Sequence, residues 1–145
     1  MKILVLADIG DLRWRRGAGR ADLVVSCGDI ADRVILEAAR AYRCETVFAV
    51  KGNHDPDTPF IGPIADLHLQ MRERDGLRIG GLNGVWRYKS RGEFLYEQWE
   101  VRSFLASFPA VDIFVSHNCP RGVHEREGEA HRGFEGNVMG SGLSN

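Results

Sequence analysis

The chain has 145 residues, of which 43% are hydrophobic and 27% charged, and its formal net charge is −1. These values are typical of one soluble globular domain, and they give no electrostatic reason to expect nucleic acid or an anionic membrane as the main partner. No apolar run approaches transmembrane length, and Asp8 interrupts the first apolar run too early for a secretory signal peptide. The three cysteines are scattered without CxxC spacing, which favours reduced thiols and a cytoplasmic location.

Strands and one helix alternate in the first third of the chain. Apolar runs predict strands over residues 2–7, 23–26 and 46–50. Between the second and third strands, apolar residues recur at helical spacing and predict a helix over residues 33–42. The order strand, helix, strand favours an α/β fold with a largely parallel sheet.

The rest of the chain continues this mixture. Strands are predicted over 67–70, 77–82 and 111–115, and a helix over 93–107. The first two of these strands form a pair joined by the polar turn "RERDG", and His68, on the first of them, is interpreted as structural. Trp86 and Tyr88 follow the second strand; they either stack on a base or sugar or cover the core, and the core is favoured.

Polar side chains follow four of the predicted strands at the point where each ends. They are Asp8, Asp29, Asn53 with His54, and His117. Each alone is compatible with a plain turn, because Gly, Asn and Asp tolerate positive φ. Ligands bind beyond the carboxyl ends of the strands in an α/β sheet, so four such ends in succession favour a common site. Oxygen and imidazole ligands together suit Mn, Fe or Zn better than Mg or Ca.

The residues at these strand ends form blocks that resemble those of a known family. The blocks are Asp8-Ile9-Gly10, Gly28-Asp29-Ile30-Ala31-Asp32, Gly52-Asn53-His54-Asp55 and Ser116-His117-Asn118-Cys119-Pro120. In order and rough spacing they are similar to the blocks of the calcineurin-like metallophosphoesterases. The resemblance implies a four-layer α/β/β/α sandwich over residues 1–136. Residues 137–145 contain little that packs, so we expect a short, poorly ordered tail there.

The same resemblance implies a function and a role for each matching residue. Asp8 would hold a first metal, Asp29 would bridge two metals, and Asn53 and His117 would hold the second, with Mn, Fe or Zn as one or two ions. The implied reaction is hydrolysis of a phosphate mono- or diester by a metal-bound hydroxide. His54, which is not needed as a ligand, would assist the leaving group.

The chain departs from the family pattern near its first block. The family has a His where this chain has Gly10, so one ligand of the first metal is missing. Asp11 is a candidate substitute ligand, or alternatively a helix cap. Arg13 and Arg16 are candidate phosphate-binding residues, although arginines of this kind are usually just solvated.

The second departure concerns the Gly-His-x-His block with which the family ends, and which this sequence lacks. We therefore expect a fold that is incomplete at its C-terminus, through truncation, frameshift or deliberate shortening. A sheet edge left uncovered would favour self-association. Three functional classes stay open: a phosphoesterase acting on a phosphate-ester substrate, a scaffold on the same fold, and a truncated product with little function.

Overall fold

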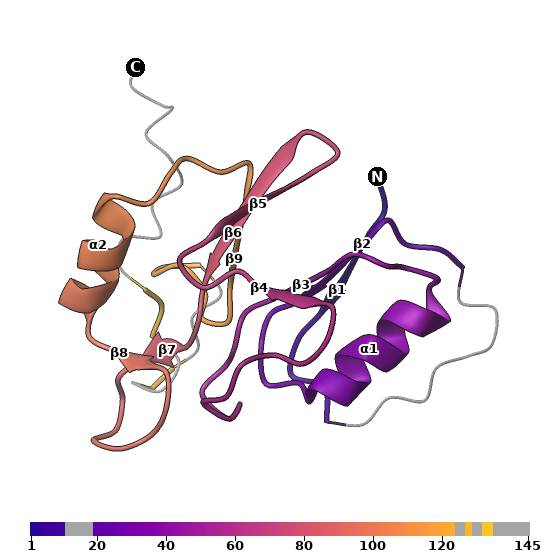
Figure 1. The fold of residues 1–145 in the computed structure, drawn as a ribbon. Helices are drawn as coiled ribbons and strands as arrows, with labels where there is room; N and C mark the ends of the chain where they lie inside the picture. The colour runs from indigo at the N-terminus through magenta and orange to yellow at the C-terminus, as the bar shows by residue number, and fades with distance from the viewer. Residues whose placement is uncertain (11–18, 124–126, 129–131, 135–145) are drawn as a thin grey trace.

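The computed structural model describes residues 1–10, 19–123, 127–128 and 132–134, and these contain two main sheets and two helices (Figure 1). Asp11, Arg13 and Arg16 lie outside the described residues, as does the predicted tail at 137–145. Neither helix of the described part has the length and hydrophobicity that crossing a membrane requires.

The first sheet is parallel throughout, and its register aligns the ends of its strands. It consists of β1 (Ile3–Leu6), β2 (Leu23–Ser26), β3 (Val47–Ala49) and β4 (Ile64–Asp66), in that spatial order. Residues at the carboxyl ends pair directly, Leu6 with Ser26 and Ser26 with Ala49. All four residues of β2 are buried, as expected for a central parallel strand covered on both faces. The loops after β1, β2 and β3 therefore start at the same edge of the sheet.

Helix α1 (Asp32–Ala41) covers one face of this sheet (Figure 1). Val34, Ile35, Ala38 and Ala39 are its buried residues, and they pack in one cluster with Leu6, Val24 and Val47 from the strands. Asp32 lies in the first turn and Arg40 in the last, an arrangement that complements the helix dipole. The predicted helix over 33–42 is thus confirmed.

The second sheet contains β5 (Met71–Arg74), β6 (Leu77–Leu82) and β9 (Ile113–Ser116). β5 and β6 form an antiparallel hairpin, whereas β6 and β9 are parallel, with Leu82 opposite Ser116. Its inner face packs against the first sheet through a cluster that includes Leu23, Val25, Phe48, Val50, Leu67, Ile79 and Val115. This contact brings the end of β9 close to the ends of β2 and β3.

The third group of elements follows β6. β7 (Val85–Trp86) pairs with β8 (Leu95–Tyr96), and α2 (Gln98–Ala106) comes next. Val101 of α2 packs with Leu82 and Phe134 in a cluster that also takes in Phe104 and Phe114. The mixed α/β class with parallel strands is confirmed; the complete four-layer sandwich stays a prediction.

Two of the predicted elements were placed wrongly. The hairpin strand is β5 at 71–74 rather than 67–70, and only Asp75 and Gly76 form its turn. Both have positive φ (51° and 79°), as a two-residue Asp-Gly hairpin turn requires. The charged sequence of β5 hid the strand, because β5 lies at a sheet edge and is largely exposed.

The helix predicted over 93–107 is shorter than expected and begins at Gln98. Residues 95–96 pair with β7 instead, and Glu97 starts the helix through a capping box with Glu100. In that box the Glu97 backbone N–H donates to the Glu100 carboxylate at 2.7 Å. Helical spacing in the sequence could not distinguish this short pairing from a first helical turn.

Candidate metal centre

Three predicted ligands meet beyond the carboxyl ends of β1, β2 and β9. One oxygen of Asp8, one of Asp29 and one ring nitrogen of His117 all lie within 4.8 Å of one another. Asp8 is exposed, whereas the side chains of Asp29 and His117 are 11% and 9% exposed. The aligned strand ends of the two sheets bring these residues together, although Asp8 and His117 are more than 100 residues apart in the sequence.

Asp8 and Asp29 both adopt a left-handed backbone conformation, with φ of 52° and 56°. For residues other than glycine this conformation costs on the order of 1 kcal/mol or more, although aspartate tolerates it better than most. The conformation turns the chain sharply after each strand. Both predicted carboxylate ligands are therefore among the non-glycine residues with a strained backbone.

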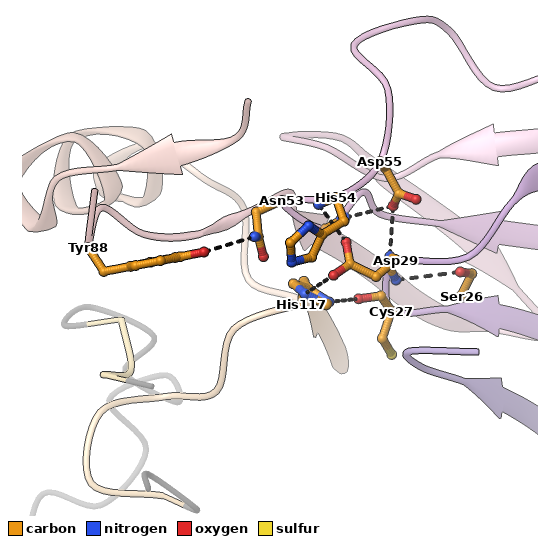
Figure 2. Close-up of polar contacts among 10 residues, drawn as sticks. Ser26, Cys27, Asp29, Asn53, His54, Asp55, Tyr88 and His117 are labelled. Carbon is orange, nitrogen blue, oxygen red and sulfur yellow. Dashed lines mark hydrogen bonds and ion pairs between the residues drawn. The ribbon is translucent and has the colours of Figure 1, made fainter. Parts of the chain in front are cut away.

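The Asp29 carboxylate uses both of its oxygens. Oδ1 accepts the backbone N–H of His54 at 2.9 Å, and Oδ2 lies 3.3 Å from Nε2 of His117 (Figure 2). Burial acts to raise the pKa of Asp29, but the hydrogen bonds from His117 and His54 outweigh it and lower the pKa. Asp29 is therefore held as a carboxylate.

The ring of His117 is oriented from its other side. Nδ1 lies 2.8 Å from the carbonyl oxygen of Cys27. A carbonyl only accepts, so Nδ1 carries the hydrogen and Nε2 faces the carboxylates. Burial acts to lower the pKa of His117, but the contact with Asp29 outweighs it and raises the pKa. Metal-bound histidines are typically oriented by such a bond from the second ring nitrogen.

Gly52 lets the loop after β3 approach these ligands. A Cβ at this position would collide with Oδ1 of Asp29 and would lie 2.8 Å from Nε2 of His117. A Cβ at Gly28 would in turn collide with the backbone of Gly52. The loops after β2 and β3 therefore pack backbone against backbone, with the ligand atoms directly beside them.

Asp55 is a residue of the site whose role the sequence did not reveal. One oxygen, Oδ2, accepts the backbone N–H of Asp29 and that of Gly52, both at 2.8 Å, and the residue is 9% exposed. The carboxylate thus joins the two loops and supports the strained backbone of Asp29. Its place in the "GNHD" block was the available signal, but a final Asp is equally common in plain turns.

Asn53 and His54 complete the loop after β3. Asn53 is half-buried, and its Nδ2 donates to the hydroxyl of Tyr88 at 3.4 Å. His54 is exposed, and Figure 2 shows its ring beside Asn53 and Asp29. Both side chains thus lie at the rim of the cluster of Asp8, Asp29 and His117.

The remaining predictions have mixed outcomes. Trp86 packs against the cluster of Leu82, Val101 and Phe134. The His68 ring stacks on the Tyr96 ring, with centroids 6.2 Å apart. The structural interpretations of both residues are therefore confirmed. The core interpretation of Tyr88 stays a prediction; its ring is half-buried, and its hydroxyl reaches Asn53 at the site. At Gly10, the position where the family has a His, an added Cβ would meet nothing within 4 Å.

The donor set fits a divalent metal. Two carboxylates and one imidazole within 4.8 Å supply the hard and borderline ligands that Mn, Fe and Zn accept. Nε2 of His117 lies 3.3 Å from Oδ2 of Asp29. A bound cation would take the place of a proton at this nitrogen. The three side chains therefore form a candidate site for a divalent ion.

Comparison with protein families gives one match. The family model described as calcineurin-like phosphoesterase matches residues 1–132. No curated protein and no solved structure is matched. The match covers most of the 145 residues and includes every block of the site. The chain therefore belongs to the calcineurin-like phosphoesterase family.

Proposed function

We propose that this protein is a metal-dependent phosphoesterase that hydrolyses a phosphate mono- or diester at the ends of β1, β2, β3 and β9. The convergence of Asp8, Asp29 and His117 is the observation that carries this proposal. Membership of the calcineurin-like phosphoesterase family supports it. A bound divalent ion would supply a Lewis acid that activates water and neutralises charge on the phosphoryl oxygens.

In this proposal the chain supplies four ligands. Asp8, Asp29 and His117 offer oxygen and nitrogen atoms within 4.8 Å, and Asn53 lies at the rim of this group. Asn53 contributes a neutral oxygen, which limits the negative charge that faces an anionic substrate. Asp29 is pre-organised, because both of its oxygens and its backbone N–H are already fixed by hydrogen bonds or ion pairing.

His54 is the proposed proton donor to the leaving oxygen. Its backbone N–H donates to Asp29 at 2.9 Å while the residue stays exposed, so the ring is accessible to a substrate from solvent. A side chain on a fixed backbone can transfer a proton without first ordering its loop. His54 is thus assigned a role in turnover, and not in metal binding.

The experiment measures metal content and turnover together. Purified protein is loaded with Mn²⁺ or Zn²⁺, and hydrolysis of nitrophenyl phosphate and of bis-nitrophenyl phosphate is followed. We expect turnover only with added metal. His54→Ala should keep its metal and lose turnover, by about 100-fold or more for a general acid. His117→Ala should lose both.

A matched control is Asp112→Asn, which removes an exposed carboxylate paired with Arg78 and away from the cluster. It should retain metal and turnover. Turnover without metal, or turnover that survives both histidine substitutions, would contradict the proposal. Metal binding without turnover of either ester would instead favour the scaffold class.

A further inference from the structure

The hydrogen bond between Asn53 and Tyr88 joins two loops that are 35 residues apart in the sequence. Nδ2 of Asn53 donates to the Tyr88 hydroxyl at 3.4 Å, and Figure 2 shows the tyrosine extended toward the amide from the opposite side of the site. Tyr88 is half-buried, and the Lys89 ammonium lies 5.2 Å from its ring centroid. The tyrosine hydroxyl therefore points at a predicted ligand.

Backbone contacts at Lys51 fix the distance between these two loops. The Lys51 N–H donates to the side chain of Asn83 at 2.8 Å, and the Gly84 N–H donates to the Lys51 carbonyl at 2.7 Å. Asn83 is 3% exposed. Two residues after this anchor the first segment reaches Asn53, and four residues after Gly84 the second reaches Tyr88.

The residues directly before Tyr88 are also held in place by hydrogen bonds. Val85 donates to the Phe94 carbonyl and Arg87 donates to the Tyr96 carbonyl, both at 2.9 Å. The Arg87 guanidinium also donates to the Leu95 carbonyl at 2.7 Å. Tyr88 therefore follows an anchored residue, and its approach to Asn53 is set by the fold.

The chemistry of an amide explains why this contact matters. An asparagine amide carries one oxygen, which can bind a metal ion, and one NH₂ group, which cannot. When the phenol oxygen accepts from Nδ2, the orientation of the amide is set and Oδ1 is left available. We propose that Tyr88 is a positioning residue that orients Asn53 as a metal ligand. The inference rests on the proposed function, because it takes Asn53 to be a ligand.

The test removes only the hydroxyl. In Tyr88→Phe we expect Mn²⁺ affinity, measured by calorimetric titration, to fall about threefold to tenfold, the effect of one neutral hydrogen bond. The urea midpoint for unfolding of the metal-free protein should be unchanged, since the contact lies at the rim of the site. Tyr42→Phe is the matched control; Tyr42 caps the C-terminal end of α1, and its substitution should leave Mn²⁺ affinity unchanged.

A second background separates positioning from packing. In Asn53→Asp both side-chain oxygens can bind metal, so the orientation no longer matters. Tyr88→Phe should therefore cost much less Mn²⁺ affinity in Asn53→Asp than in the wild type. An equal loss in both backgrounds would overturn the inference, because it would indicate a role in packing alone.

The remaining outcomes distinguish the inference from the proposed function. If Asn53→Ala weakens Mn²⁺ binding but Tyr88→Phe does not, the positioning role is overturned and the metal centre stands. If Asn53→Ala binds Mn²⁺ as tightly as the wild type, Asn53 is not a ligand. That result would overturn both the inference and this part of the proposed ligand set.

Discussion

At the scale of single residues, the site is organised around Asp29. Its backbone is strained, with φ of 56°, and its N–H, Oδ1 and Oδ2 each have a partner from another segment of the chain. Each partner offsets part of the cost of the left-handed backbone and reduces the freedom of the carboxylate. Asp55 contributes most directly, because one of its oxygens serves both Asp29 and Gly52.

We predict that Asp55→Ala lowers both stability and metal affinity. It leaves the backbone N–H groups of Asp29 and Gly52 without their acceptor, at about 1–3 kcal/mol for each group that stays buried. The free energy of unfolding, measured in urea, should fall by about 2–4 kcal/mol. Mn²⁺ affinity, measured by titration, should fall with it.

Asp55→Asn is the informative comparison. Both hydrogen bonds end on a single oxygen, Oδ2, and an asparagine keeps one oxygen acceptor. This variant should therefore recover most of the lost stability. An Asp55→Ala protein as stable as the wild type would show that the two loops are held together without this carboxylate.

At the scale of elements, the two sheets are connected through His68 and Asn83. Nδ1 of His68 accepts the Asn83 N–H at 3.1 Å, and the Asn83 side chain accepts the Lys51 N–H at 2.8 Å. His68 follows β4, Asn83 follows β6 and Lys51 follows β3. The same connection places the loops of Asn53 and Tyr88 opposite each other. The state of His68 therefore affects how the sheets meet.

We predict that His68 makes stability depend on pH. Burial lowers the pKa of His68 below its ordinary value of 6.5, although Asp66 partly opposes this. The folded protein therefore keeps His68 neutral where the unfolded chain binds a proton. Its contribution is present above about pH 6.5 and is lost as the pH falls below that value toward the folded pKa.

The measurement is urea unfolding of the wild type and of His68→Gln at pH 8 and pH 5.5. A glutamine does not titrate, so the wild type should lose more stability than the variant on acidification. An equal change in both proteins would show that His68 does not cause this pH dependence.

At the scale of the whole molecule, metal binding should be coupled to folding, because the ligands come from β1, β2, β3 and β9 in two different sheets. The ligand set Asp29, Asn53 and His117 is more buried than Asp8, which is exposed. Self-association through a sheet edge stays a prediction; Val5 on the edge strand β1 is 60% exposed.

We predict that Mn²⁺ raises the melting temperature, and that His117 contributes more to this increase than Asp8. At 100 times the dissociation constant, a bound metal stabilises the folded state by about 2.7 kcal/mol. His117→Ala should abolish this shift, whereas Asp8→Ala should retain part of it. Thermal unfolding with Mn²⁺ and with a chelator measures both effects. Equal losses in the two variants would show that the exposed Asp8 contributes as much to metal binding as the buried His117.

The amino-acid sequence was sufficient to predict the fold class, most of the elements and the candidate ligands. Apolar runs mark buried strands because a strand covered on both faces carries few polar side chains. Polar residues at the ends of such runs then mark the one edge of a parallel sheet where ligands gather. Asp8, Asp29 and His117 could be chosen in this way, since the signal lies within a few residues of each strand.

The groups that support those ligands could be identified only in the folded structure. The Cys27 carbonyl contacts His117, which is 90 residues away in the sequence. Tyr88 and Asn53 are 35 residues apart, and Asp55 and Asp29 are 26 apart. Local sequence patterns record burial and turn propensity, but they carry no information about which distant backbone or side-chain group faces a given atom. That pairing depends on strand register and on how the two sheets pack, and these are fixed only when the whole core forms.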